Sequence, residues 1–343
     1  MTPHAGMPPV AAMVALAATL LIVALGACTA DQAPEPDRAT SGRSAAPPAS
    51  PTVSRSPTPP PSTTPTPEEP PADSPRPERF REDLALRTVR HLALRIGPRH
   101  ATSPAFAEAV RWTSSRLRDL GYDVRRQPVQ VPGGVSWGAP VSRGVSHNVV
   151  ATTPRFDPTA PYLLVGAHLD TVPPAPGAED NASGVSVVLE LARLATSEGT
   201  RLPVVFVLFG AEEPRGSGDD LHHFGSTAYV ERLSPVERSN LVAMVSLDRV
   251  GVGQAVPVCT GGLSPLVVQQ QLVGAAAAVD VATTRCTDNQ SSDHWSFEKA
   301  GVAVARIGST PYAAYHGAAD LPGVVSESQL RRVGTTMWRW LTG

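Results

Sequence analysis

Two histidines and four acidic residues, spread between positions 168 and 316, are of the types that hold metal ions in proteins. They are His168, Asp180, Glu212, Glu213, Asp248 and His316. Imidazole nitrogens and carboxylate oxygens are common ligands of zinc. Two imidazoles and three carboxylates would serve two zinc ions, and the remaining glutamate would accept a proton from a water that the metals activate. The set therefore indicates metal-dependent hydrolysis.

His168 and Asp180 each have a second interpretation. Asp170 follows His168 by two residues, so its carboxylate would hold the second ring nitrogen of a metal-bound imidazole. Without a metal, His168 would be a hydrogen-bonded histidine at the end of a strand. Asp180 precedes an apolar helical segment and would suit a helix N-cap. Its two oxygens would also bridge two metals, and its acidic and imidazole neighbours favour that role.

Glu212 and Glu213 are adjacent at the end of an apolar run. Like charges at a buried sheet edge repel each other, and a nearby divalent cation removes the repulsion. We expect Glu213 to bind metal and Glu212 to act as the base.

Asp248 and His316 would complete the two sets of metal ligands. The alternative for Asp248 is a salt bridge to Arg249, and the alternative for His316 is an exposed loop position.

The elements that must position these groups alternate along the chain. Apolar spacing predicts helices over 79–96, 103–120, 181–195, 226–232, 265–279 and 327–341. Apolar runs predict strands over 124–131, 146–151, 162–167, 202–209, 241–247 and 302–307. This order predicts an α/β fold of three layers, with helices on both faces of a mixed, mostly parallel sheet.

Four of the polar residues stand just past the end of a predicted buried strand. His168 follows the strand 162–167, the pair Glu212 and Glu213 follows 202–209, and Asp248 follows 241–247. In open α/β sheets, ligands bind at the carboxyl ends of the strands. We therefore expect these groups to meet at one edge of the sheet.

The motifs together resemble those of the co-catalytic di-zinc aminopeptidases, the secreted bacterial and vacuolar type of peptidase clan MH. The matching segments cover most of the stretch from residue 96 to residue 320. They are Gly97–Arg99, Ala167–Asp170, Asp180–Gly184, Gly210–Glu213, Gly225–Ser226, Tyr229–Val230, Leu247–Asp248, Ser292–His294 and Tyr315–His316.

The resemblance implies a zinc exopeptidase-like fold and peptide substrates. It implies two zinc ions bridged by Asp180, one bound by His168 and Asp248 and the other by Glu213 and His316. It further implies that Glu212 is the general base, that the Asp180–Asn181 peptide is cis, and that the hydroxyl of Tyr315 can polarise the scissile carbonyl.

One segment departs from the pattern of this family. The segment between Glu213 and Gly225, residues 214–224, is longer than the corresponding segment of typical members. The segment follows a catalytic motif, so we expect it to border the cleft. For its two histidines, His222 and His223, an exposed loop is favoured over a metal site.

The N-terminal segments predict export. Residues 1–28 contain an apolar run and end in Leu-Gly-Ala-Cys28, which resembles a lipoprotein signal; an ordinary secretory signal is the alternative. Residues 29–78 are rich in Pro, Ser and Thr and are expected to form a disordered tether to a peptidase domain over 79–343. The protein would then lie on the outer face of the membrane, held by a lipid on Cys28.

Net charge and cysteine content limit the kinds of partner that the sequence suggests. With 29 basic and 31 acidic residues the net charge is −2, and no basic run suggests nucleic acid. We expect a monomer. Cys259 and Cys286 would form an intrachain disulfide in an oxidising compartment, the alternative being two buried thiols.

Other enzyme classes fit less well. The chain contains neither the Gly-x-Ser-x-Gly elbow of serine hydrolases nor the His-Glu-x-x-His motif of single-zinc proteases. The alternatives are a carboxypeptidase or glutaminyl-cyclase-like acyltransferase on the same scaffold, and a catalytically dead, lipid-anchored binding protein.

Overall fold

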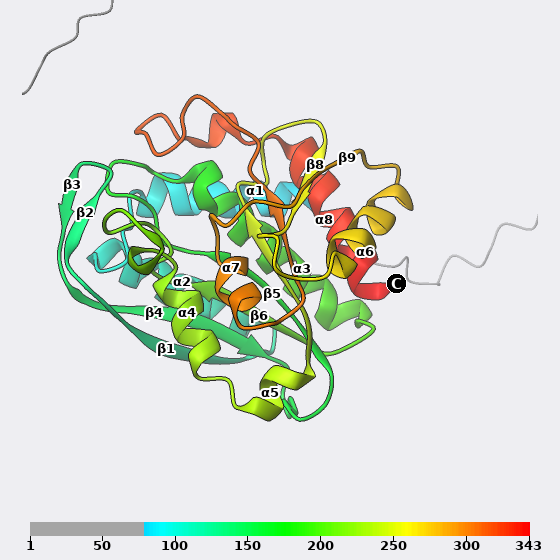
Figure 1. Ribbon diagram of the computed structural model, residues 1–343. Coiled ribbons are helices and arrows are strands. Elements are labelled where there is room, and N and C mark those ends of the chain that lie inside the picture. Colours follow the sequence, from blue (N-terminus) through cyan, green and yellow to red (C-terminus); the bar gives the residue numbers. More distant parts are fainter. Residues whose placement is uncertain (1–78) are drawn as a thin grey trace, which may run out of the picture. The chain divides into compact units, whose positions relative to one another are not determined.

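An eight-stranded sheet forms the centre of the computed structural model, which describes residues 79–343 (Figure 1). The order across the sheet is β1–β4–β6–β5–β7–β10–β8–β9. The strands are β1 (Asp123–Val131), β4 (Gly144–Thr152), β5 (Tyr162–His168), β6 (Val204–Phe209), β7 (Leu241–Asp248), β8 (Val256–Cys259), β9 (Thr283–Cys286) and β10 (Val304–Gly308). The expected signal peptide, tether and Cys28 lie outside the described residues.

The sheet is mixed and mostly parallel, as the sequence predicts. The central strands β6, β5, β7 and β10 run parallel to one another, and β8 is parallel to β9. The antiparallel pairs are β1 with β4, β4 with β6, and β10 with β8. The chain passes from β5 to β6 on one side and then returns to β7 on the other side of β5. The strand order therefore reverses at β5, and such a reversal is where open sheets bind ligands.

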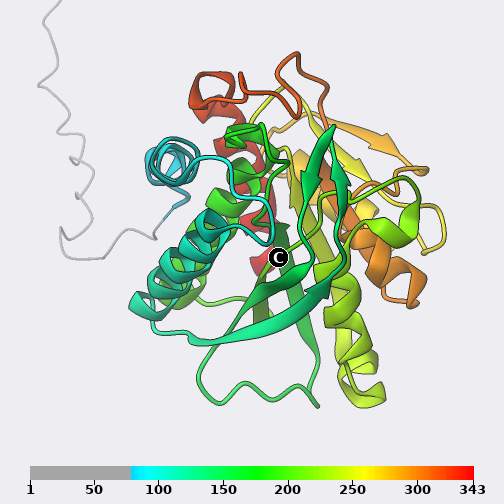
Figure 2. The same cartoon turned by 90° about the vertical axis from the view of Figure 1, so that its left-hand side faces the viewer.

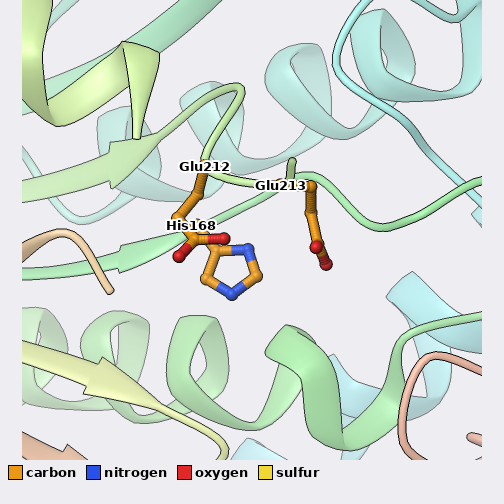
Figure 3. A group of neighbouring side chains, drawn as sticks. All are labelled: His168, Glu212 and Glu213. Atoms are coloured by element: carbon orange, nitrogen blue, oxygen red, sulfur yellow. The ribbon is translucent and has the colours of Figure 1, made fainter. Parts of the chain in front are cut away.

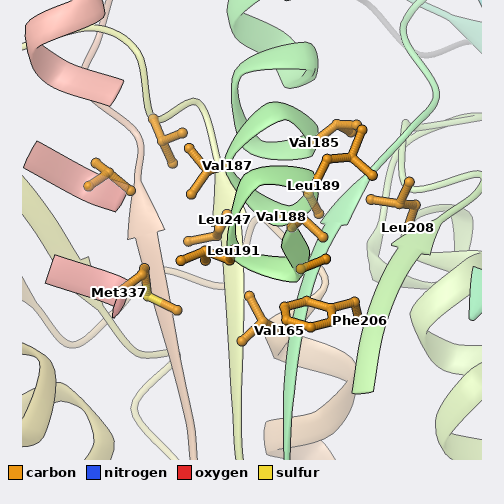
Figure 4. Packing of buried hydrophobic residues seen from close by; sticks show 14 of the residues in the cluster. Val165, Val185, Val187, Val188, Leu189, Leu191, Phe206, Leu208, Leu247 and Met337 are labelled. Atoms are coloured by element: carbon orange, nitrogen blue, oxygen red, sulfur yellow. The ribbon is translucent and has the colours of Figure 1, made fainter. Parts of the chain in front are cut away.

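The two faces of the sheet carry separate apolar clusters. In β5, Leu163 and Val165 belong to one cluster, whereas Tyr162 and Leu164 belong to the other. Because successive side chains of a strand point to opposite faces, a continuous apolar run is the pattern of a strand covered on both sides. The larger cluster packs the strands against α3, and Figure 4 shows its valines and leucines interlocking with Phe206 of β6.

Helices cover both faces and complete three layers. One layer contains α1 (Glu82–Arg90) with its π-helical extension His91–Ile96, α2 (Pro104–Asp119), α3 (Gly184–Glu198), α6 (Val267–Ala277) and α8 (Glu327–Thr342). The other contains α4 (Phe224–Glu231), α5 (Pro235–Asn240) and α7 (His294–Lys299). No helix among residues 79–343 combines the length and apolar character needed to span a membrane.

The ends of α2 illustrate how local sequence fixes the elements. The Ser103 hydroxyl accepts a hydrogen bond from the amide of Phe106 at 3.0 Å, and Pro104 occupies the first helical position. Gly121, with φ of 89°, follows the last turn in a left-handed conformation that glycine adopts without steric cost. The predicted boundaries of this helix are therefore confirmed.

Several short elements were not predicted. Strands β2 (Gly134–Ser136) and β3 (Ala139–Val141) form a separate hairpin (Figure 2), and β8, β9, α5 and α7 were also missed. The predicted helix 181–195 begins at Gly184, because Asp180 and Asn181 have non-helical backbone angles. They lie in an irregular π-helical turn, η2 (Ala178–Ser183), that precedes α3.

The predicted disulfide joins Cys259 and Cys286. Their strands, β8 and β9, are parallel neighbours, and the two cysteines are paired in register with their Cα atoms 4.5 Å apart. The bond therefore links the two strands at one end of the sheet order.

Candidate metal centre

His168 and Asp248 meet where two neighbouring strands end. His168 is the last residue of β5, and Asp248 is the last residue of β7. Nε2 of His168 lies 3.5 Å from Oδ1 of Asp248 and 3.1 Å from Oδ1 of Asp180. All three side chains are buried. They form a triad whose ligand atoms lie within 4.8 Å of one another.

A second triad shares Asp180 with the first. The other oxygen of Asp180, Oδ2, lies 3.0 Å from Nε2 of His316, and that nitrogen is 3.4 Å from Oε2 of Glu213. These ligand atoms also lie within 4.8 Å of one another. The structure thus places the two oxygens of Asp180 against different histidines. The five residues expected as ligands are together, with Asp180 between the two pairs.

Backbone contacts on both sides of Asp180 hold its carboxylate in place. The Asp180–Asn181 peptide is cis, as the family resemblance implies. The amides of Glu179 and Asp180 donate to the two oxygens of Asp320, at 2.9 and 3.1 Å. The side-chain amide of Asn181 donates to the carbonyl of Leu247 at 2.9 Å, which ties this turn to the end of β7.

Arg99 fixes the loop that connects His168 to Asp180. Its side chain is completely buried. The guanidinium donates to the carbonyl oxygens of Leu169, Pro176 and Gly177, at 2.8, 2.7 and 3.0 Å. Three main-chain acceptors in one loop satisfy the buried donors and restrict the loop path. The Gly-Pro-Arg motif therefore acts at the site through the backbone.

Asp170 contacts the glutamate pair more closely than it contacts His168, which corrects the sequence-based expectation. Its carboxylate lies 3.8 Å from Nδ1 of His168, longer than a hydrogen bond, whereas its main-chain oxygen lies 3.2 Å from that nitrogen. The carboxylate instead accepts from the amides of Glu212 and Glu213, at 3.1 and 3.2 Å. Asp170 therefore positions the loop after β6.

The two glutamates extend from this loop toward the centre. Figure 3 shows the carboxylate of Glu212 beside the ring of His168, with the side chain of Glu213 next to it on the same side of the loop. One ligand atom from each of His168, Glu212 and Glu213 lies within 4.8 Å of those of the other two. Both residues are largely buried. Glu213 also lies 3.4 Å from His316, whereas Glu212 lies 3.3 Å from His223, so the two adjacent acids have different further neighbours.

Arg306 is a neighbour of the centre that sequence reasoning missed. It lies on β10, and its buried guanidinium donates to Oδ2 of Asp248 at 2.8 Å. Arg249, the partner considered from the sequence, is more distant at 3.8 Å. Its position could have been suspected from the sequence, because Arg306 is the one charged residue in the otherwise apolar run 302–307.

The donor set fits divalent cations of the zinc type. Burial, together with the negative charges of Asp180 and Glu212, raises the pKa of Glu213 well above its usual range. Within residues 79–343, Oε1 of Glu213 and Oδ1 of Asp248 are buried and make no hydrogen bond. Buried acids that face imidazoles and retain free oxygens are suited to metal coordination. Carboxylate and imidazole ligands in this mixture agree with zinc.

Aromatic residues form one rim of the centre. The ring of Tyr315 stacks on that of His316 with centroids 3.7 Å apart, and the guanidinium carbon of Arg249 lies 4.4 Å from the Tyr315 centroid. Trp137, at the tip of the β2–β3 hairpin, meets His316 edge-on at 4.3 Å. Trp137 is 54% exposed and Tyr315 is 40% exposed. Both rings are therefore accessible beside the second triad.

Arg215 anchors the hairpin that carries Trp137. Its buried guanidinium donates to the carbonyls of Pro132 and Ser142, which flank the hairpin, at 3.0 and 2.8 Å. The amide of Val135 donates to the Arg215 carbonyl at 3.2 Å. Through Arg215, residues 214–224 therefore support the hairpin whose tip lies beside His316.

The expectation of an exposed histidine pair in 214–224 is wrong for His223. His223 is only 2% exposed, and its Nε2 lies 3.3 Å from Oε1 of Glu212. His222 is half-buried. The sequence did not reveal that the segment folds back onto Glu212, because the segment has no apolar periodicity from which its path could be predicted.

A buried set of histidines and carboxylates at the switch point of a three-layer α/β/α fold defines a candidate two-metal centre. Residues 148–341 match the model of Peptidase family M28, so the chain belongs to this family. The matched segment begins in β4 and contains all six residues predicted at the centre.

Three sequence relatives and two solved structures extend this comparison. Aminopeptidase YwaD of Bacillus subtilis is 33% identical over 182 residues, an alignment that covers 50% of this chain and 38% of the relative. The chain thus matches well under half of that protein's length. Two Pseudomonas aeruginosa aminopeptidases are matched over only 18% of theirs.

The structural neighbours share the fold. The zinc aminopeptidase BSAP from Bacillus subtilis superposes with a TM-score of 0.68 at 20% identity, over 76% of this chain and 94% of that one. A glutaminyl cyclase from Bacteroides thetaiotaomicron gives a TM-score of 0.65 at 18% identity, over 78% and 99% of the two chains. The scaffold is therefore common to proteins whose names describe different reactions.

Proposed function

We propose that this protein is a zinc aminopeptidase that releases N-terminal residues from peptides. Membership of family M28 supports a peptidase, and the relative YwaD is named an aminopeptidase. The observation that carries the proposal is the arrangement of Asp180, whose two oxygens face His168 and His316 at 3.1 and 3.0 Å. A carboxylate placed in this way suits a bridge between two cations.

The proposed ligand sets follow the two triads. His168 and Asp248 would hold one zinc ion, Glu213 and His316 would hold the other, and Asp180 would serve both. When bound, zinc would polarise the scissile carbonyl and lower the pKa of a water in the cleft to about 7. Asp170, Asp320 and Arg99 would keep the ligands in place through the backbone contacts described above.

Glu212 is the proposed general base. Its carboxylate is next to the first triad and is outside both proposed ligand sets. It would accept a proton from the attacking water and transfer that proton to the leaving amine. The accessible hydroxyl of Tyr315 would donate a hydrogen bond to the carbonyl oxygen as negative charge develops there.

Hydrolysis of aminoacyl anilides by the purified protein tests the proposal. We expect activity that a chelator abolishes and that added zinc restores. The isosteric change Glu212→Gln should lower kcat at least ~100-fold, because a neutral amide cannot accept the proton. Full activity in the Glu212→Gln variant would reject this base. If the metal-replete wild-type protein hydrolyses none of these substrates, the proposed aminopeptidase activity is rejected.

The α-amine of the substrate separates the alternatives. An aminopeptidase should lose activity when that amine is acetylated, whereas a carboxypeptidase should not. A glutaminyl-cyclase-like enzyme should release ammonia from peptides that begin with glutamine. The cyclase is a specific alternative because its fold is nearly as similar to this chain as that of the aminopeptidase structure, with TM-scores of 0.65 and 0.68. A binding protein with a dead site should do none of these.

We also propose that the peptidase domain, residues 79–343, acts outside the cytoplasm. The signal-like residues 1–28 and the disulfide between Cys259 and Cys286 support an exported protein, since disulfides persist in oxidising compartments. Lipid on Cys28 and a tether over residues 29–78 would hold a monomeric domain at the outer face of the cell membrane. Cys28→Ala should release the protein from membranes; an unchanged membrane fraction would reject the anchor.

A further inference from the structure

The segment 214–224 returns a buried histidine to the proposed base. Nε2 of His223 lies 3.3 Å from Oε1 of Glu212, and the ring is 2% exposed. Neither ring nitrogen makes a hydrogen bond within residues 79–343, where the carboxylate of Glu212 is the charged group nearest to the ring. A buried polar ring without other partners is costly unless its one charged neighbour compensates it. The contact with Glu212 is therefore the main polar interaction available to this ring.

The backbone also brings His223 and Glu212 together. The amide of His223 donates to the carbonyl of Glu212 at 3.0 Å, and the amide of Phe224 donates to the carbonyl of Ala211 at 2.9 Å. These two bonds close the base of the loop formed by the segment. His223 itself is left-handed, with φ of 57°, immediately before α4. Histidine tolerates this conformation better than bulky or β-branched residues do.

A surface ion pair lies on the other side of the ring. Nδ1 of His223 is 3.7 Å from Oδ1 of Asp219, and Asp219 pairs with Lys299 of α7 at 2.5 Å. The ring is thus placed between an acid at the surface and the acid at the centre. The Glu212 contact requires a donor at Nε2, and a ring that carries a proton on both nitrogens also donates toward Asp219 from Nδ1.

We propose that His223 is a positioning residue for Glu212. Its Nε2–H group would hold one carboxylate oxygen and leave the other for the proton of the attacking water. A base that is free to rotate loses rate, because proton transfer needs a donor and acceptor within hydrogen-bond reach. This inference rests on the proposed function, since it requires that Glu212 act as a base.

Two substitutions at one position separate positioning from folding. His223→Gln keeps a side-chain N–H donor, whereas His223→Phe keeps ring volume and removes every donor. Neither new residue is favoured at positive φ, so the backbone cost is similar in the two variants. The exposed Asp220→Asn change in the same loop is the control and should leave kcat unchanged.

We expect His223→Phe to lower kcat about 10-fold or more, the size of effect seen when a supporting hydrogen bond is removed. KM should change less than about twofold, zinc content should be unchanged, and His223→Gln should recover most of kcat. Equal losses in the Phe and Gln variants, or wild-type kcat in His223→Phe, would overturn the inference. A fall in kcat that is proportional to a fall in bound zinc would also overturn it.

A double-mutant cycle distinguishes failure of this inference from failure of the base. In the Glu212→Gln background, His223→Phe should have no further effect, because there is no longer a base to position. If the two losses multiply, His223 acts independently of Glu212 and the inference fails. If Glu212→Gln alone retains full activity, it is the proposed function that fails.

Discussion

The ends of the central strands and the loops beside them build the centre in different ways. His168 and Asp248 are the last residues of β5 and β7, so the paired strands fix their separation directly. The groups around them come from loops that have no such ladder. Arg99, Arg215 and Asp320 hold those loops by contacts with backbone carbonyls or amides.

The difference shows where the centre is robust and where it can vary. A strand end in a packed sheet moves only when the core moves, because interiors are close-packed. A loop held by one guanidinium or one carboxylate depends on that group and changes if it is replaced. The proposed metal chemistry would therefore depend on the strand ends and their bridge, and substrate preference on the loops.

The largest expected effect is at the bridge between the strand ends. Asp180→Asn keeps the size of the side chain but removes its charge, so it should weaken both proposed zinc sites. We expect activity to fall by at least about 1,000-fold, since Lewis-acid catalysis contributes several kcal/mol. The exposed Asp157→Asn is the control. Unchanged zinc content and activity in Asp180→Asn would contradict the bridging role.

An intermediate effect is expected where a strand-end segment supports a loop. Asp170→Asn weakens the acceptor of the Glu212 and Glu213 amides, at 3.1 and 3.2 Å. Loss of such a supporting contact should reduce zinc affinity or activity about 10- to 100-fold. Competition with a chelator would measure the affinity. An effect as large as that of Asp180→Asn would mean that Asp170 contacts metal itself.

The smallest effect is expected at the rim, on the hairpin that Arg215 anchors. Trp137→Ala removes an accessible aromatic surface next to Tyr315 and His316. We expect KM for substrates with a large apolar first residue to rise about threefold, and KM for alanyl substrates to change little. The exposed Val135→Ala on the same hairpin is the control. Equal changes for both substrates would show that the hairpin does not select side chains.

The strand-end part of this comparison could be predicted from the sequence. The runs at 162–167, 202–209 and 241–247 are apolar without interruption, which is typical of strands covered on both faces. Parallel strands bring their carboxyl ends to one edge, so the residues that follow must lie near one another. His168, Glu213 and Asp248 accordingly come together beside Asp180, whereas Asp180 and His316 themselves belong to segments that do not directly follow a strand.

The loop part could not be predicted in the same way. Asp320 and His223 reach the centre from loops, through contacts between residues that are far apart in sequence or through a segment that returns on itself. Arg306 reaches it from β10, again through a contact with a residue distant in sequence. Apolar periodicity carries no information about such contacts, since it reports only which face of an element is buried. The hairpin of β2 and β3 was missed because each strand has only three residues and β3 contains Pro140.

A crystal structure of the zinc-loaded protein, with anomalous data at the zinc absorption edge, tests the central claim most directly. We predict two zinc peaks, one next to His168 and Asp248 and one next to Glu213 and His316, both within bonding distance of Asp180. A single peak, or two peaks that do not share Asp180, would contradict the proposed two-metal centre.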